Sequence, residues 1–395
     1  MPSALAEHWT LDPSINYLNH GSFGACPRVV LAAQRDLQDR LERSPVKFLD
    51  RELPGLLRAA TERLAGFLNA DPDDIVPIAN ATSGVNTVLW SLPFEAGDEL
   101  LVTDHAYNAC RMALDRVAEV SGAVVRVVTL PLPVESDAQI VSLVLNQVTS
   151  RTVLALIDHV TSPTGLVLPV EQLVQELSAR GVETLIDGAH VPGMLPLDLR
   201  RLGASFYTGN AHKWLCAPKG AAFLYVAREL QAQVRPLVVS HGANKPLSDE
   251  SQRFRAEFEW TGTVDPTAYL SIPAALDAIA SWVPGGWPEV MQRNHQQVVQ
   301  ARRMLLERWN RPPLCPESML GSIATIQLPD APPDGRTSFL QADPWQQRLF
   351  DEHRIEVPIF AWPAPPRRLL RISAQLYNAP SDYEKLAAAV ETLAR

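Results

Sequence analysis

Two residues near the middle of the chain have types and positions that could serve one reaction. Residues 182–190 have the pattern of a buried strand that ends at Asp187. Residues 204–214 have the pattern of the next strand, and Lys213 follows it, 26 positions after Asp187. An acid and an amine at the ends of neighbouring strands can converge on one small molecule. Pyridoxal phosphate needs this pair, because an amine attaches its aldehyde and a carboxylate keeps its ring nitrogen protonated.

The elements that must position these residues alternate between strands and helices. The apolar patterns predict strands at 75–79, 99–103, 124–128, 153–158, 182–186, 204–208 and 221–226, and helices at 56–69, 107–121, 137–149 and 169–180. Such alternation is typical of a mostly parallel sheet with helices on both faces. Ligands of these sheets bind outside the carboxyl ends of the strands, where Asp187 and Lys213 are expected.

The pattern changes after residue 264. It predicts helices at 266–283, 288–309 and 381–394 and strands at 322–328, 355–360 and 368–373. We therefore predict an α/β fold with a large domain, residues 31–265, and a smaller C-terminal α+β domain, residues 266–395. Residues 1–30 are expected to pack with the small domain.

Composition excludes several function classes. The chain has 395 residues, of which 35 are basic and 44 acidic, so its net charge of −9 argues against nucleic acid or anionic membrane as a partner. The four cysteines are scattered without CxxC spacing, which predicts free packing thiols in a reducing compartment and no metal site. The first ten residues do not resemble a secretory signal, and no apolar run approaches the ~18 residues of a membrane span. A cytoplasmic location is expected.

Residues 80–84 predict a phosphate site. They follow a strand and open a helix, and a helix N-terminus offers free N–H groups and a positive dipole end. Ala81, Thr82 and Ser83 would hold the phosphate, although an ordinary helix cap has the same pattern. His190 could contact the cofactor ring or its phenolic oxygen. His212 is a phosphate candidate, with a structural histidine as the alternative.

Several motifs in the same order give the chain a family resemblance. Residues 187–190 (Asp-Gly-Ala-His) and 210–214 (Asn-Ala-His-Lys-Trp) resemble the class V aminotransferase superfamily of fold type I pyridoxal-phosphate enzymes. Residues 18–27, 158–165 and 260–265 are similar to the isopenicillin N epimerase-like branch. The similarity runs along nearly the whole chain. It implies a homodimer with a shared active site, acting on an amino acid.

The resemblance also implies roles for further residues. His105 or Tyr107 would stack on the cofactor ring, and Ser162 and Asn210 would contact the cofactor. Thr263 would reach the phosphate of the neighbouring subunit. The run 371–378 matches the pattern Arg-x-Ser-x-x-x-Tyr-Asn, in which Arg371 grips the substrate α-carboxylate bidentately. The other residues expected to contact substrate are Asn19, His20 and Phe23.

The reaction itself is less closely defined by the sequence. The stretch 355–371 contains no cysteine, which argues against the persulfide mechanism of cysteine desulfurases. Lys213 would take the Cα proton. An epimerase would then need a second acid, Tyr107 or His105. The alternatives are a C–S β-lyase of the ergothioneine-pathway type, an aminotransferase, and a catalytically inactive cofactor-binding protein. A nucleotide-binding Rossmann protein is disfavoured, because no GxGxxG follows the first strands.

Overall fold

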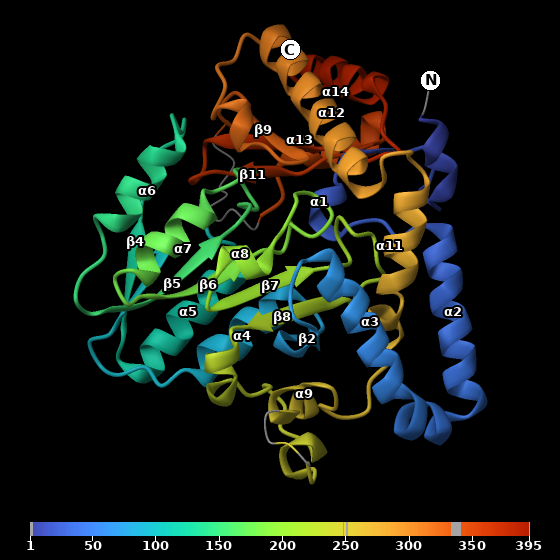
Figure 1. Cartoon of the computed structure of the whole chain (residues 1–395). Helices are drawn as coiled ribbons and strands as arrows, with labels where there is room; N and C mark the ends of the chain where they lie inside the picture. The colour runs from blue at the N-terminus through green and yellow to red at the C-terminus, as the bar shows by residue number, and fades with distance from the viewer. Residues whose placement is uncertain (1–2, 248, 250–251, 333–340, 395) are drawn as a thin grey trace.

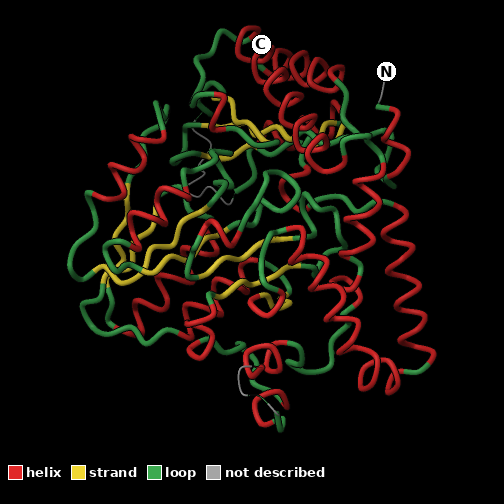
Figure 2. Tube along the Cα trace, in the orientation of Figure 1, coloured by secondary structure: helices red, strands yellow, loops and turns green. Residues whose placement is uncertain are grey.

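The computed structural model describes residues 3–247, 249, 252–332 and 341–394. Figure 1 shows a central sheet with helices on both sides and a smaller group of elements above it. Figure 2 shows the strands of the central sheet across the middle of the molecule and those of the smaller sheet above them, beneath the helices at the top. The fold is therefore α/β, as the alternating pattern predicts.

The central sheet has seven strands in the order β2-β8-β7-β6-β5-β3-β4. Five of them, β4, β3, β5, β6 and β7, are parallel to one another, and β8 runs antiparallel to both β7 and β2. The strands are β2 (Ile75–Ile78), β3 (Glu99–Thr103), β4 (Val124–Val128), β5 (Thr152–Asp158), β6 (Glu183–Asp187), β7 (Phe206–Asn210) and β8 (Ala222–Val226). Because β5, β6 and β7 are parallel neighbours, their carboxyl ends meet at one edge.

Helices cover both faces of this sheet, and their apolar sides form its core. The predicted helices are present with shifted ends: α3 (Leu53–Phe67), α5 (Asn108–Ser121), α6 (Asp137–Leu145) and α7 (Val170–Ser178). The helix expected after residue 80 is α4 (Ala81–Ser91), and the short α8 (Leu199–Leu202) precedes β7. The helices α2 (Arg28–Arg43) and α9 (Arg253–Phe258) were not predicted. Helix α2 is mostly exposed and polar, but Val30, Leu37 and Leu41 recur at helical spacing on its buried side, so the sequence did carry a signal for it.

A second sheet lies in the C-terminal part, with the order β11-β12-β9 and antiparallel pairing. Its strands are β9 (Ile323–Gln327), β11 (Ile359–Ala361) and β12 (Arg368–Ser373), and the helices around it are α12 (Gly286–Arg308), α13 (Pro344–His353) and α14 (Pro380–Leu393). The N-terminal strand β1 (Asn16–Tyr17) pairs in parallel with β10 (Ile355–Glu356). The N-terminal segment thus contacts the C-terminal elements, while the three domain boundaries stay a prediction.

Two predicted elements are divided in the structure. The predicted strand 355–360 is two strands, β10 and β11, in different sheets, because Pro358 between them cannot donate a ladder hydrogen bond. The predicted helix 266–283 is α10 (Thr267–Leu270) followed by α11 (Ile272–Ser281), with Pro273 in the first turn of α11. A proline fits a first helical turn and interrupts a helix interior, so one continuous helix is disfavoured there.

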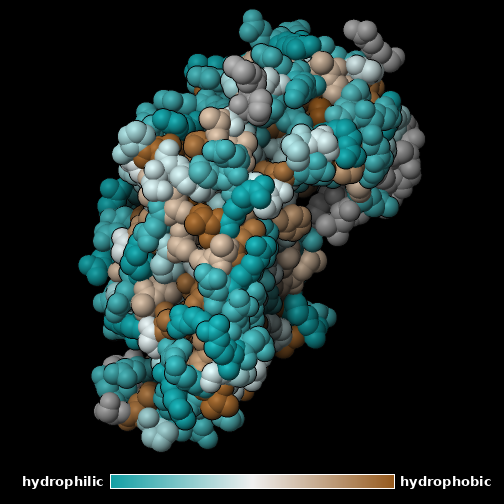
Figure 3. Space-filling model, turned by 90° about the vertical axis from the view of Figure 1, so that its right-hand side faces the viewer, coloured by the Kyte–Doolittle hydropathy of each residue, from teal (hydrophilic) through white to brown (hydrophobic). Residues whose placement is uncertain are grey.

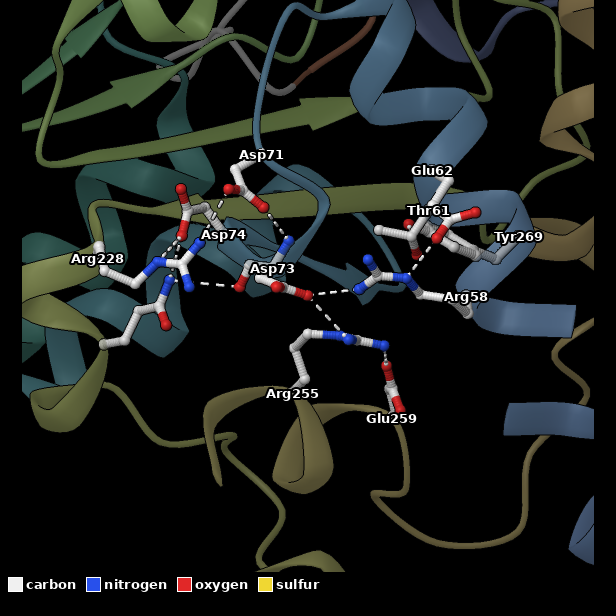
Figure 4. A network of polar contacts seen from close by, with 11 residues as sticks. Arg58, Thr61, Glu62, Asp71, Asp73, Asp74, Arg228, Arg255, Glu259 and Tyr269 are labelled. Atoms are coloured by element: carbon white, nitrogen blue, oxygen red, sulfur yellow. Dashed lines mark hydrogen bonds and ion pairs between the residues drawn. The ribbon is translucent and has the colours of Figure 1, made fainter. Parts of the chain in front are cut away.

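A polar network ties α9 to the body of the protein (Figure 4). Asp73 accepts hydrogen bonds from Arg58 of α3 and, at 3.0 Å, from Arg255 of α9. Arg255 also pairs with Glu259 at 2.6 Å. One carboxylate shared by two guanidinium groups joins Arg58 of α3 to Arg255 of α9, which lies 197 positions later in the sequence. These contacts hold α9 against the body of the protein, and the segment that follows α9 leads to residue 263.

Candidate active site

Lys213 lies just beyond the carboxyl end of β7, at the edge of the sheet where the sequence predicts it. Its Nζ atom is 3.2 Å from His190 Nε2, and its backbone carbonyl is 3.0 Å from His20 Nε2. Burial, followed by the charge of Arg371, lowers the Lys213 pKa to about 8. An amine with this pKa is partly neutral near neutral pH, so it can act as a nucleophile or a base.

Asp187 ends β6, next to β7, and points its carboxylate into the same region. Its Oδ1 accepts the Ala189 N–H at 3.0 Å, and its Oδ2 accepts the Cys110 thiol at 3.1 Å. Burial raises the Asp187 pKa, while the Lys213 charge opposes that rise. The electrostatic effect is mutual, because the Asp187 charge raises the Lys213 pKa. The acid and the amine therefore converge.

His190 is buried beside the amine. Its Nδ1 lies 3.5 Å from the Trp214 indole N–H, and burial holds its pKa well below the ordinary value, so the imidazole is neutral. The structure thus brings His190 to Lys213. Its contact with the cofactor's ring or phenolic oxygen stays a prediction.

The start of α4 lies next to the end of β7. The Ala81 N–H donates to Asn210 Oδ1 at 2.8 Å, and the Ser83 N–H donates to the Asn80 side chain at 2.9 Å. Asn210 therefore ties β7 to α4. Thr82 and Ser83 are half-buried at the same helix end, which carries the positive end of the helix dipole. This arrangement fits an anion such as phosphate.

His212 has a backbone contact of its own. Its Nδ1 lies 3.1 Å from the Ala221 carbonyl, and burial lowers its pKa to about 4, so the ring is neutral. A neutral imidazole that donates from Nδ1 presents Nε2 as an acceptor. This geometry favours the structural alternative for His212 over a phosphate contact.

The two candidates for the ring-stacking role lie in different surroundings. His105 is 1% exposed, its Nδ1 is 2.8 Å from Thr164 Oγ1, and its ring meets Trp362 edge-on. Tyr107 is 44% exposed and lines the cavity, and the charges of Asp187 and Arg371 act on its phenol. The geometry favours Tyr107, because it lines the cavity, whereas His105 is buried against Thr164 and Trp362.

Arg371 is a buried guanidinium on β12, in the second sheet. It donates to the Ser162 carbonyl at 2.5 Å and to the Ser22 hydroxyl at 3.1 Å, and the Phe360 ring covers it at 5.0 Å. Burial lowers its pKa to about 10, so it remains charged at neutral pH. Its Nε has no hydrogen-bond partner among the described residues. A buried cation with unused donor capacity suits a carboxylate ligand.

A cavity of about 700 Å³ opens between the two sheets beside these groups. On the face shown in Figure 3, the molecule is hollowed between an upper lobe and the larger lower body. The predicted residues that line the cavity are Asn19, Phe23, Tyr107 and Ser162. Phe23 is 71% exposed there. Pockets of this size accommodate small-molecule ligands.

The N-terminal motif, residues 18–27, contacts the loop that carries Lys213, which the sequence did not reveal. His20 is buried behind the cavity, where its Nδ1 is 2.8 Å from the Tyr377 hydroxyl and its Nε2 meets the Lys213 carbonyl. Gly24 has a φ of 71°, and a Cβ there would lie 2.2 Å from the His212 carbonyl. The motif therefore supports the Lys213 loop. Substrate contact by His20 stays a prediction that this position does not favour.

Within this chain, Thr263 lies apart from the other predicted site residues. It is exposed and borders a hollow that is lined by Gln38 and Leu41 of α2. An exposed position is compatible with a contact to a second subunit, which stays a prediction.

Two residues near Asp187 were not predicted as part of the site. Asp158 ends β5 in register with Asp187, and Cys110 lies in the first turn of α5. All four cysteines are buried and free, as expected, but the Cys110 thiol also donates to Asp187. Asp158 carries the same signal as Asp187, an acid that closes a buried strand. The contact of Cys110 leaves no such signal, because it depends on the orientation of α5.

Comparison with known proteins decides the family. The family model for aminotransferase class V matches residues 17–385. The chain belongs to the class V aminotransferase family. It is a pyridoxal-phosphate enzyme. It is 36% identical to an isopenicillin N epimerase of Amycolatopsis lactamdurans, over 98% of each chain. It is 35% identical to a probable chloroplastic L-cysteine desulfhydrase of Arabidopsis thaliana, over 97% of this chain and 84% of the relative.

A solved structure supports the fold. The C-DES enzyme, in a mutant form with glycine covalently linked to its PLP cofactor, superposes with a TM-score of 0.78. The two chains are 24% identical, and the match covers 96% of each. The fold is therefore that of the fold type I enzymes.

The residues present fit the cofactor. Lys213 would attach it, Asp187 would face its ring nitrogen, and the start of α4 would hold its phosphate. When bound, pyridoxal phosphate withdraws electrons from the substrate Cα. No helix in the described residues is long and apolar enough to cross a membrane. In that same part of the chain, no group of three or more His, Cys, Asp or Glu side chains could hold a metal ion.

Proposed function

We propose that this enzyme moves a proton at the Cα of an amino acid, and that it is an amino-acid epimerase. One observation carries the proposal: the Tyr107 phenol lines the same cavity as Ser162, whose carbonyl accepts a hydrogen bond from Arg371, and the charge of Arg371 acts on both Tyr107 and Lys213. Epimerisation needs one group that removes the proton and another that supplies a proton from the opposite face.

The protonation states suit these roles. The Lys213 amine has a pKa of about 8, so its neutral form can accept the Cα proton near neutral pH. Burial raises the Tyr107 pKa, so its phenol stays protonated and can donate. Arg371 would hold the α-carboxylate and thereby fix which bond at Cα faces Lys213. In the reverse direction the amine and the phenol exchange roles.

The test is incubation of the enzyme with L- and D-amino acids in deuterated water. We expect both enantiomers of a substrate to form, with deuterium at Cα. Tyr107→Phe removes only the hydroxyl and is expected to lower racemisation by about 10²-fold or more, while exchange of the L-substrate's Cα proton continues through Lys213. Chiral chromatography and mass spectrometry measure the two rates. An equal loss of racemisation and of Cα proton exchange would contradict the placement of Lys213 and Tyr107 on opposite faces of the substrate.

A sulfur β-lyase is the second candidate. It is supported by the 35% identity to the probable L-cysteine desulfhydrase of Arabidopsis thaliana. The same Cα proton is removed by Lys213, and a sulfur group then leaves Cβ. Release of pyruvate from a cysteine derivative in the incubation would favour this reaction, and formation of the keto acid of the added substrate would favour an aminotransferase. A bound cofactor without any of these products would indicate a catalytically inactive protein.

The enzyme is also proposed to be a homodimer with a shared active site. Five apolar side chains on or near the 237–264 segment and the α2–α3 connection are more than half exposed, from 52% for Leu237 to 69% for Val239. The others are Val46, Val238 and Val264. A cavity of about 660 Å³ lies between the same two regions. Clustered exposed apolar groups are typical of protein interfaces, and Thr263 lies next to Val264.

The interface prediction can be tested with a charge on this surface. Val239→Asp is expected to convert a dimer into a monomer, because an unpaired carboxylate would be buried at the interface. Light scattering after gel filtration measures the mass. Val120→Asp is the matched control, since Val120 is 57% exposed on α5, away from this segment. A wild-type monomer, or equal effects of both variants, would contradict the proposed surface.

A further inference from the structure

Two buried carboxyl groups lie side by side at the centre of the site. Asp158 and Asp187 are register partners at the ends of the parallel strands β5 and β6. They are 2% and 4% exposed. Two adjacent carboxyl groups in an apolar interior do not both ionise, because each negative charge raises the pKa of the other. Such a pair therefore favours a state in which one of the two groups holds a proton.

The hydrogen bonds distinguish the two acids. Asp187 receives two donors, the Ala189 N–H at 3.0 Å and the Cys110 thiol at 3.1 Å. Asp158 receives one, the Tyr107 N–H at 3.1 Å, and its Oδ1 has no partner among the described residues. Donors favour the charged form of a carboxyl group. Asp187 is thus the acid with the support needed to be ionised, and Asp158 is the acid suited to the proton.

The electrostatic environment agrees with this assignment. Burial and the Asp187 charge raise the Asp158 pKa well above its ordinary value. Burial also raises the Asp187 pKa, but the Cys110 and Ala189 hydrogen bonds and the Lys213 charge oppose the rise. The titratable groups that face the pair from the surrounding elements are Cys110, Tyr107, Lys213 and Tyr207.

The first turn of α5 connects these contacts. The Tyr107 N–H, at the N-cap of α5, donates to Asp158, and the Cys110 thiol in the first turn donates to Asp187. The turn therefore contacts both acids while Tyr107 projects into the cavity. The protonated ring nitrogen of the cofactor takes a carboxylate partner.

We propose that Asp158 and Cys110 are positioning residues: Asp158 carries the proton of the carboxyl pair, and the Cys110 thiol holds Asp187 as the anion that faces the cofactor's ring nitrogen. This inference rests on the function proposed above, since it assigns to Asp187 the role of partner to that nitrogen. It adds two residues and a protonation state to the site.

The test measures the affinity of the protein for pyridoxamine 5′-phosphate from pH 5 to 9, by fluorescence titration. This probe lacks the aldehyde, so attachment to Lys213 does not contribute. Cys110→Ala removes a donor from Asp187 and raises its pKa, so the fall in affinity towards acid pH is expected to begin about one pH unit higher. Cys110→Ser keeps a donor and is expected to follow the wild-type curve.

Asp158→Asn is not expected to move the fall in affinity to higher pH, in contrast to Cys110→Ala. The amide is neutral, like the protonated acid, so the affinity at pH 7 is expected to stay within about threefold of the wild-type value. The fall in affinity towards acid pH is expected to begin at the same pH as in wild type or at a lower pH. Cys315→Ala is the control for loss of a buried thiol away from the site. An unshifted acid fall in Cys110→Ala, or a shift to higher pH in Asp158→Asn, would overturn the assignment.

A second ligand separates positioning from general stability. The analogue whose ring nitrogen is replaced by carbon cannot pair with Asp187, so Cys110→Ala is expected to leave its pH curve unchanged. Equal effects on both ligands would mean that Cys110 only supports the fold. Wild-type protein that binds neither the probe nor pyridoxal phosphate would refute the proposed function instead, which keeps the two failures distinct.

Discussion

Lys213→Ala is expected to abolish the visible absorbance that pyridoxal phosphate gains on covalent attachment, and to lower turnover by at least about 10³-fold. The amine is the attaching group and the base at Cα, so one substitution removes both functions. Spectroscopy of the purified protein with added cofactor measures the first effect, and steady-state kinetics measures the second.

The neighbouring Lys219 provides a matched control. Its Nζ donates to the Gly24 carbonyl at 2.9 Å, and it lies on the same loop as Lys213. Lys219→Ala is expected to keep the absorbance and most of the turnover. If Lys219→Ala lost the absorbance and Lys213→Ala kept it, the attachment site would be misassigned.

The same amine predicts a pH dependence. Only a neutral amine attacks an aldehyde, and the Lys213 pKa is about 8. The rate of cofactor attachment is therefore expected to rise with pH and to level off above pH 8. An ordinary lysine would still be rising at pH 10. Asp187 raises the Lys213 pKa, so Asp187→Asn is expected to move this plateau to lower pH.

The sequence predicted the parts of the site that depend on strand order. Asp187 and Lys213 each follow an apolar strand, and parallel neighbours bring their ends to one edge, so their convergence could be inferred from spacing and pattern. The antiparallel direction of β8 could not, because an isolated apolar strand such as 222–226 carries no signal of direction.

The remaining parts depend on how separate elements pack. The choice between His105 and Tyr107 depends on which side chain the Trp362 and Thr164 contacts bury, and these residues come from distant segments. The contact of Cys110 with Asp187 spans 77 positions. Such contacts follow from tertiary geometry, on which local pattern gives no information.

Arg371→Ala is expected to lower kcat/KM for an α-amino acid by about 10²- to 10³-fold, because a bidentate bond between a guanidinium and a carboxylate would be lost. Cofactor attachment is expected to persist. Arg371→Lys keeps the charge without the paired geometry, so its loss is expected to be intermediate.

The substrate's own carboxylate supplies the decisive comparison for Arg371. An amine that lacks the α-carboxylate cannot use the guanidinium, so its reaction at the cofactor should be slow with wild-type enzyme and no slower with Arg371→Ala. Arg371 also donates to the Ser162 carbonyl and the Ser22 hydroxyl, so it could instead act only by joining these segments. In that case the substitution would slow both substrates equally and lower the melting temperature. A selective loss with the carboxylate-bearing substrate therefore separates substrate binding from a structural role.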